Sequence, residues 1–320
     1  MGELGDGERI TRLPEPTRVG DGYRAIATGV RQNTIGVKND GSLWAWGRAR
    51  TYPYGLILDY KPVQLGDGYL TVSAGLDNYA IKADGTLWAW SVQNGNSAGE
   101  LGDGTAEERL SPVQIGTDFA SVSANSALGG AVGVKRDGTL WAWGPNRYGT
   151  VGDGSTTDRQ IPVKIGKGFV AAVAGCYHAA GLKNDGTVWT WGGGGYGQLG
   201  NGSTADVYQK TPIQVATGFV SIAADCTSMF GIRADGSSWA WGGTASGQLG
   251  DGVTAPAGAK GTPTRMQGNF TQFGAGLGHT LALRPDGSLW EWGIVLGMKF
   301  MQEKIPTGVP VQIGIGFSKD

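Results

Sequence analysis

Hydrophobic and polar residues alternate in short stretches along this chain, and one such stretch recurs six times. Each copy has Asp-Gly, two further residues and then Trp-x-Trp, as in Asp-Gly-Thr-Leu-Trp-Ala-Trp at residues 137–143. The copies follow one another at intervals of 44 to 53 residues and contain all twelve tryptophans, so the chain is a repeat protein. The pairs are Trp44/Trp46, Trp88/Trp90, Trp141/Trp143, Trp189/Trp191, Trp239/Trp241 and Trp290/Trp292.

Each copy predicts a β-hairpin. Asp-Gly between two strand-like runs favours a type I′ turn, because both central residues of that turn need positive φ. Side chains alternate between faces in the strand that follows, so the two tryptophans share one face and the residue between them takes the other.

A second repeated pattern is a proline followed seven residues later by Tyr or Phe. Because proline cannot donate a ladder hydrogen bond, it suits an edge strand or the first residue of a strand. Each copy therefore predicts an outer strand that turns into the next strand of the chain. Seven copies occur, at Pro16/Tyr23, Pro62/Tyr69, Pro112/Phe119, Pro162/Phe169, Pro212/Phe219, Pro263/Phe270 and Pro310/Phe317.

Four short strands in each repeat, without helical periodicity, predict an all-β fold: a β-propeller of four-stranded blades. Six blades are favoured because there are six Trp-x-Trp units, while the seven proline segments leave a seven-bladed or incomplete array as the alternative. We expect one domain over residues 1–320 and a structural core made by the twelve tryptophans, packed between blades. The expected repeats are approximately 16–61, 62–111, 112–161, 162–211, 212–262 and 263–309, with partial repeats at 1–15 and 310–320.

The repeat resembles the regulator-of-chromosome-condensation repeat. The motifs that carry the resemblance are Gly-x-x-His, Asp-Gly-x-Leu-Trp-x-Trp-Gly and Gly-Gln-Leu-Gly-x-Gly, with the fullest copies at residues 175–202 and 276–292. The resemblance implies a propeller, typically of seven blades, and its style is typical of bacterial or phage members. Family functions range from guanine-nucleotide exchange to photoreception and enzyme inhibition, so the resemblance implies no single activity.

Composition excludes several classes of partner. Charged residues make up 17% of the chain and the net charge is −1, which does not favour binding to nucleic acid or an anionic membrane. Neither a signal peptide nor an 18-residue apolar stretch is present, so we expect a soluble protein of the cytoplasm or of a larger assembly. We expect no disulfide between Cys176 and Cys226, because equivalent positions in adjacent repeats commonly lie too far apart.

The residues with catalytic or ligand-binding potential are best explained by the fold. His178 and His279 sit at the same point of their repeats, without metal-ligand spacing, and we expect structural hydrogen bonds there. The Gly-x-Ser-x-Gly at 95–99 is not followed by the helix that a nucleophile elbow needs. The aspartates of the Gly-Asp-Gly loops, such as Asp103, fit turn chemistry better than calcium binding. We therefore expect no enzyme activity, cofactor or bound metal.

Two loops break the repeat and are unusually apolar, at residues 48–60 and 294–304. An apolar, aromatic loop cluster is typical of a protein-binding surface, or else it seals the junction between the first and last blades. The first hypothesis makes the chain a binding or structural module for another protein or for a second copy. Its expected anchors are Tyr52, Tyr54, Tyr60, Met298 and Phe300.

Two other functions are possible from the sequence. A carbohydrate-binding propeller would stack sugars on Tyr148 and Tyr196, which occupy the same position of successive loops. A nucleotide-exchange regulator of a small GTPase is the other alternative, and it is disfavoured because the family insertions for that activity are missing.

Overall fold

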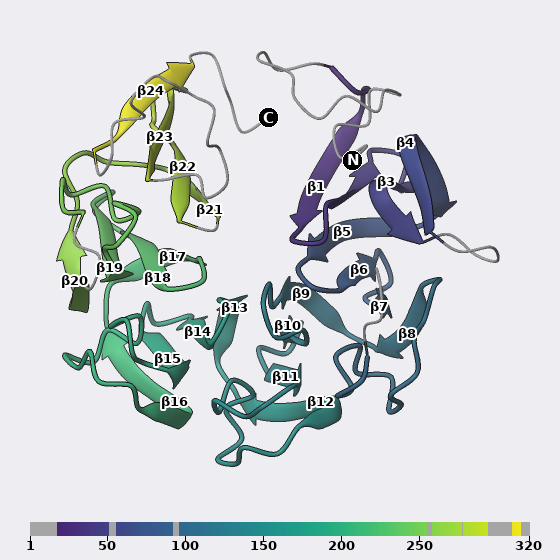
Figure 1. Cartoon of the computed structure of the whole chain (residues 1–320), viewed down its shortest axis with the longest axis horizontal. Helices are drawn as coiled ribbons and strands as arrows, with labels where there is room; N and C mark the ends of the chain where they lie inside the picture. The colour runs from purple at the N-terminus through teal and green to yellow at the C-terminus, as the bar shows by residue number, and fades with distance from the viewer. Residues whose placement is uncertain are drawn as a thin grey trace. The chain divides into compact units, whose positions relative to one another are not determined.

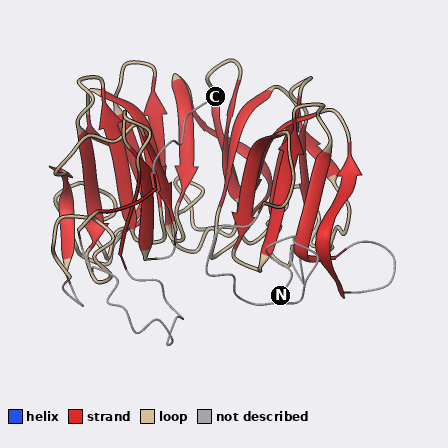
Figure 2. Ribbon diagram, turned by 90° about the horizontal axis from the view of Figure 1, so that it is seen from above, coloured by secondary structure: helices blue, strands red, loops and turns tan. Residues whose placement is uncertain are grey.

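The structure, a computed structural model, describes residues 18–50, 56–91, 96–254, 258–276, 278–293 and 309–314, without the side chains of 48–50, 56–60 and 314. These residues form 24 strands in six four-stranded antiparallel sheets, and no helix occurs among them (Figures 1 and 2). The fold is the predicted all-β propeller, and each sheet is one blade. Six blades, rather than seven, occur in the described part of the chain.

The chain divides into two compact units of three blades each, residues 1–147 with 156–168 and residues 148–155 with 169–320. In the first unit, blade 1 contains β1 (Tyr23–Gly29), β2 (Asn33–Lys38), β3 (Leu43–Arg50) and β4 (Leu56–Gly66). Blade 2 contains β5 (Tyr69–Ala74), β6 (Asn78–Lys82), β7 (Leu87–Trp90) and β8 (Val113–Gly116). Blade 3 contains β9 (Phe119–Ala124), β10 (Ala131–Lys135), β11 (Leu140–Gly144) and β12 (Arg159–Gly166).

The second unit contains the other three sheets. Blade 4 contains β13 (Phe169–Ala174), β14 (His178–Lys183), β15 (Val188–Gly193) and β16 (Tyr208–Ala216). Blade 5 contains β17 (Phe219–Ala224), β18 (Ser228–Arg233), β19 (Ser238–Gly243) and β20 (Ala259–Arg265). Blade 6 contains β21 (Gln272–Ala275), β22 (His279–Leu283), β23 (Leu289–Gly293) and β24 (Val311–Gly314).

The blades are offset from the sequence repeats. The proline segment forms the fourth strand of the preceding sheet, as at Pro162 in β12, so the next blade begins at the aromatic residue seven positions later or, in blade 6, two residues after it. Strand β24 follows Pro310 and pairs with β23, where Trp290 lies opposite Gln312. The last proline segment therefore supplies the fourth strand of blade 6 rather than the start of another blade.

The Asp-Gly turn differs from the predicted type I′. In the turn at 184–187 only Gly186 has positive φ, at 79°, and its N–H donates to the carbonyl of Lys183 over 3.0 Å. The Asp185 side chain explains the difference, because its Oδ1 accepts hydrogen bonds from both N–H and Oγ1 of Thr187 at 3.0 and 2.6 Å. A carboxylate that bonds the chain two residues on stabilises the turn without a second left-handed residue.

Ser or Thr follows the Asp-Gly in all six repeats and links the turn to the first tryptophan of the pair. In blade 4, Trp189 Nε1–H donates to Oγ1 of Thr187 over 2.9 Å. The same relay from Asp through Ser or Thr to Trp occurs in every blade, with aspartates Asp40, Asp84, Asp137, Asp185, Asp235 and Asp286. Hydrogen bonds from the Ser or Thr lower the pKa of each of these carboxyls.

The two tryptophans of a pair have different surroundings, although we expected all twelve in the core. The second tryptophan of each pair is buried, with at most 3% exposure: Trp46, Trp90, Trp143, Trp191, Trp241 and Trp292. In blade 1, Trp46 is 2% exposed and its ring centre lies 5.7 Å from that of Tyr23. The first tryptophan of each pair is only half-buried: Trp44, Trp88, Trp141, Trp189, Trp239 and Trp290. The hydrogen bond from each first tryptophan to its turn explains the difference, because it holds that indole near the end of the blade.

A Lys or Arg from the second strand covers the first tryptophan and the aromatic residue of the first strand. Lys183 Nζ, for example, lies 4.0 Å from the Trp189 ring centre and 5.2 Å from that of Phe169. All six blades repeat this cation–π arrangement. The half-buried ring is therefore shielded by a side chain of its own blade.

In blades 1 to 5 the residue between the tryptophans is also buried, which simple alternation between core and solvent does not predict. Ala142 and Ala240 are at most 3% exposed. The apolar clusters of each unit join side chains of neighbouring blades, as where Tyr79 of blade 2 meets Trp143 of blade 3. A sheet packed on both faces buries both sides of its central strands.

Cys176 and Cys226 form a disulfide, contrary to our expectation, with their Cα atoms 4.2 Å apart. Both lie in turns between the first and second strands, in blades 4 and 5. The first strands of these neighbouring blades, β13 and β17, contact each other directly, so equivalent positions at this edge lie closer than repeat spacing suggests. No helix among the described residues is long and apolar enough to cross a membrane.

Candidate functional site

The connections of each blade lie at two ends. Because consecutive strands are antiparallel, the turn after the first strand and the loop after the third lie at one end, here called the loop end. The Asp-Gly turn and the link to the next blade lie at the other, here called the turn end. The Gly-Asp-Gly loops, which follow the third strand, belong to the loop end.

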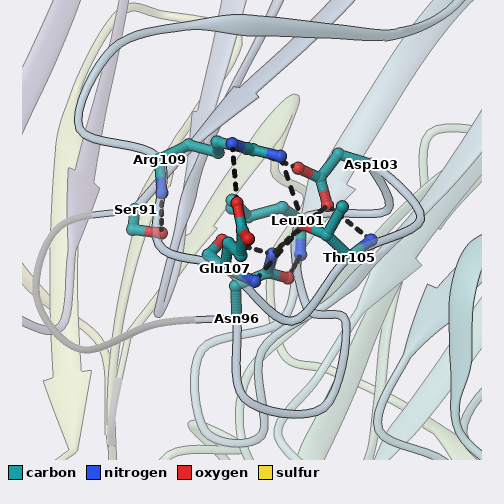
Figure 3. Close-up of polar contacts among 7 residues, drawn as sticks. All are labelled: Ser91, Asn96, Leu101, Asp103, Thr105, Glu107 and Arg109. Carbon is teal, nitrogen blue, oxygen red and sulfur yellow. Dashed lines mark hydrogen bonds and ion pairs between the residues drawn. The ribbon is translucent and has the colours of Figure 1, made fainter.

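The Gly-Asp-Gly loop at residues 96–109 is held by its own polar side chains (Figure 3). Asp103 Oδ1 accepts from Thr105 N–H at 3.0 Å and Thr105 Oγ1 at 2.8 Å, while Oδ2 accepts from Arg109 Nε at 2.7 Å. Asn96 spans the loop, since its Nδ2 donates to the Glu107 carbonyl at 2.6 Å and its Oδ1 accepts from Leu101 N–H at 3.0 Å. Burial would raise the pKa of Asp103, but hydrogen bonds from Arg109 and Thr105 outweigh it and lower that pKa.

Two of the Gly-Asp-Gly loops, and the equivalent loop with Asn201 in place of the aspartate, also accept a hydrogen bond from the second tryptophan of the following blade. Trp241 Nε1–H donates to the Gln198 carbonyl over 3.0 Å, and a Cβ at Gly200 would lie 2.8 Å from that nitrogen. The loops at Gly152 and Gly250 meet Trp191 and Trp292 in the same way. The glycine is therefore required by the indole edge, and the loop is anchored to the core of the next blade.

One loop end carries a cluster of tyrosines, within the second unit. Tyr148 lies between Tyr177 and Tyr208, with ring centres 5.2 Å from each and both pairs edge to face. Tyr148 comes from a Gly-Asp-Gly loop, Tyr177 from the turn before β14, and Tyr208 from the first position of β16. Tyr208 is 44% exposed and its neighbour Val207 is 49% exposed, so the cluster reaches the surface.

Tyr196 has the corresponding position in the next loop but different surroundings. In blade 5, Thr227 and Ala259 stand where blade 4 has Tyr177 and Tyr208. The Tyr196 side chain is 52% exposed. The structure therefore gives Tyr148 two aromatic neighbours, whereas Tyr196 lies over a blade without them.

His178 is fully buried, and burial lowers its pKa to about 4, so the ring is neutral at physiological pH. A Cβ at Gly175 would overlap the imidazole, which explains the glycine of the Gly-x-x-His motif. In blade 5, Asp225 takes the position of the glycine and Ser228 that of the histidine. Asp225 Oδ1 accepts from the N–H of Thr227 at 2.7 Å and of Ser228 at 2.5 Å. The space that His178 fills in blade 4 is thus filled in blade 5 by the side chain of Asp225.

Two buried carboxyl groups have raised pKa values. Burial raises the pKa of Asp225 to about 7, and burial together with the charge of Glu100 raises that of Asp77 to about 7. Each sits at the loop end of its own blade. In the described part of the chain no three His, Cys, Asp or Glu residues gather as a metal ligand set.

The expected anchors of the apolar loops fall largely outside this description. Tyr52, Tyr54, Met298 and Phe300 lie outside the described residues, and Tyr60 is described only as part of β4. Their role in binding stays a prediction. Sequence reasoning missed Tyr177, which lies inside the Gly-x-x-His motif, and Tyr208, which follows the loop at residues 197–202.

Residues 137–182 and 185–228 match the model of the regulator of chromosome condensation (RCC1) repeat, and residues 169–198 match a second model of that repeat. The RCC1 repeat models therefore match this part of the chain, within blades 3 to 5. No curated protein matches the chain in sequence.

Several solved structures share the fold. Human WBSCR16 has a TM-score of 0.76 at 17% identity, over 92% of this chain and 82% of that one. Yeast RCC1 (Prp20), solved bound to Kap60, has a TM-score of 0.73 at 18% identity, over 88% and 73%. Prp20p from Saccharomyces cerevisiae, in a study of its binding to Gsp1p and histones, has a TM-score of 0.71 at 19% identity, over 88% and 75%.

Proposed function

We propose that this chain is a non-enzymatic binding module whose propeller loops hold a protein partner. The observation that carries the proposal is the tyrosine cluster at the loop end of blade 4, in which Tyr208 is exposed and Tyr148 and Tyr177 are half-buried. Tyrosine supplies large contact area with few rotatable bonds, and it is enriched at the centres of protein interfaces. The fold relative Prp20p was studied for binding to Gsp1p and histones, which supports protein binding as a use of such a propeller.

The loops that present the cluster are stiff. The loop of Tyr148 is tied to the core through the hydrogen bond from Trp191 Nε1–H to the Thr150 carbonyl, 2.8 Å long. Tyr208 pairs with Gly193 in the edge of the sheet. Residues held in this way lose little conformational entropy when a partner binds, so more of the contact energy becomes affinity.

The arrangement of the rings favours a protein over a sugar. A sugar stacks on the open face of an aromatic ring, but Tyr148 already has two tyrosines at its sides. Tyr196 has the more exposed ring, and it is the specific observation in favour of the carbohydrate alternative. A glycan array with wild type and Tyr196→Ser separates the two, because Ser246 is the natural equivalent of Tyr196 in the next loop.

The decisive variant is Tyr177→Thr with Tyr208→Ala, which gives blade 4 the residues that blade 5 has. In quantitative affinity capture, this variant should no longer bind the proteins that wild type enriches, while Tyr196→Ser should still bind them. Its melting temperature should remain near that of wild type, because neither side chain is fully buried. Equal capture by all three proteins would rule out the cluster as the binding surface. Sedimentation velocity with the same set tests whether the partner is a second copy of this chain.

A further inference from the structure

Blade 1 has a cavity of about 380 Å³ at its turn end. The lining comes from the segment before β1 and from β1, β2, β3 and β4. Its residues are Arg18, Val19, Gly20, Tyr23, Lys38, Trp44, Lys61 and Pro62. The volume falls in the range of pockets that take small organic ligands.

The charge of the lining is one-sided. Arg18, Lys38 and Lys61 are cationic, and none of the lining residues is a carboxylate. Asp21 forms an ion pair with Arg18 at the exposed rim, which offsets part of the charge. Lys38 Nζ lies 4.4 Å from the Trp44 ring centre and 5.3 Å from that of Tyr23, so its ammonium is held against two aromatic rings of the lining.

The other repeats show which of these charges the fold itself needs. A Lys or Arg at the position of Lys38 occurs in every blade and belongs to the cation–π arrangement. The positions of Arg18 and Lys61, by contrast, are Gln64 and Ser111 in blade 2 and Gln114 and Ile161 in blade 3. In no other repeat are both positions cationic. The charges of Arg18 and Lys61 thus occur together only in blade 1, and a blade forms without them.

We propose that this cavity binds a phosphorylated small molecule of about mononucleotide size. A phosphate monoester carries nearly two negative charges and three acceptor oxygens, which suits a cavity lined by three cations. Arg18 offers a planar pair of N–H donors, and Lys38 and Lys61 act as point charges. The organic part of the ligand would lie against the apolar part of the lining, Val19, Trp44 and Pro62. This site belongs to the first unit and the tyrosine cluster to the second, so the inference does not depend on the proposed function.

The test is isothermal titration of the full chain with phenyl phosphate, AMP and inorganic phosphate. Arg18→Gln with Lys61→Ser gives blade 1 the residues of blade 2, and it should weaken binding of the two esters by about tenfold or more. Lys164→Gln with Lys210→Thr removes two exposed charges elsewhere and should leave affinity unchanged. Thermal melting shows that both variants are folded, and added salt should weaken binding by wild type.

Absence of binding by wild type to both esters would overturn the proposal. An equal loss in the control variant would show general charge attraction instead of a site and would overturn it too. If inorganic phosphate binds as tightly as the esters, the organic part of the ligand makes no favourable contact with the lining, and the proposal is refuted. Tighter binding of the esters, lost only in the blade 1 variant, is the result expected.

Discussion

The anchoring of these loops to the core can be tested with two glycines of the loop at residues 197–202, in which Asn201 stands in place of the aspartate. Gly200 and Gly202 both have positive φ, at 72° and 90°. A Cβ at Gly200 would lie 2.8 Å from Trp241 Nε1, whereas a Cβ at Gly202 would meet nothing within 4 Å. Gly200→Ala and Gly202→Ala therefore share the backbone strain and differ in the clash.

The expected magnitudes follow from these contacts. An L-residue in the left-handed region costs about 1–2 kcal/mol, so Gly202→Ala should lower the free energy of unfolding by that amount. Gly200→Ala adds overpacking, typically about 1–3 kcal/mol. It also displaces the indole from its 3.0 Å hydrogen bond to Gln198, and a buried donor without its partner costs about 1–3 kcal/mol. The difference between the two variants should therefore be about 2–6 kcal/mol, the sum of these two costs.

Urea unfolding followed by circular dichroism measures both losses. A double-mutant cycle with Trp241→Phe gives the control, because phenylalanine has no Nε1 at the point of contact. In that background the cost of Gly200→Ala should fall toward the cost of Gly202→Ala. Equal losses for the two alanines in the wild-type background would refute the argument that the indole edge selects the glycine.

Two further predictions concern pH and the disulfide. The pKa of Asp225 is about 7 in the folded protein against 3.8 ordinarily, so the folded state retains a proton and the contribution of Asp225 to stability falls as pH rises from about 4 to 7. Asp225→Asn should therefore gain stability over wild type as pH rises through that window. A difference in urea midpoint that does not change with pH would contradict this. The pKa of His178 is lowered from 6.5 to about 4 and has the opposite effect on stability, but His178 is present in both proteins. The Cys176–Cys226 disulfide spans 50 residues, and its reduction should cost about 4 kcal/mol in the chain-entropy account. Free thiols that react with an alkylating agent in the unreduced, unfolded protein would show that the bond is absent.

The candidate sites were harder to predict than the blades. Tyr148 was recognisable because Tyr196 has the same position in the next loop, but Tyr177 and Tyr208 lie 29 and 60 residues further along the chain. Their contact exists because the loop of one blade packs on the next, which repeat spacing alone does not show. The phosphate cavity was missed for the same reason, since Arg18 and Lys61 are ordinary surface cations until the fold brings them to one opening.

The two tryptophans of a pair share a face of their strand, but this does not determine whether each ring is buried. Trp44 and Trp46 have the same place in the alternation of their strand, yet only Trp46 is fully buried. The Trp44 indole instead donates to Ser42 of the turn over 2.7 Å and lies beneath Lys38. The position along the blade, and not the face of the strand, therefore separates the two rings.

For the Asp-Gly turn, the local sequence rule predicted the position but not the turn type. Its position was predicted in every repeat, but its type was wrong because the rule considered only the backbone. The Ser or Thr after the glycine was the missed signal: it occurs in all six repeats and bonds both the aspartate and the first tryptophan.

The sequence by itself determined the all-β class and the position of nearly every hairpin, and it favoured six blades over seven. These depend on contacts within about fifty residues, and a period repeated six times shows them clearly. Tertiary structure alone decided which blade contains each proline strand and which tryptophan of a pair is buried. It also decided that Cys176 meets Cys226, and which tyrosines form a surface. Those outcomes depend on how one blade packs against the next, and packing distances between repeats are not encoded in their spacing along the chain.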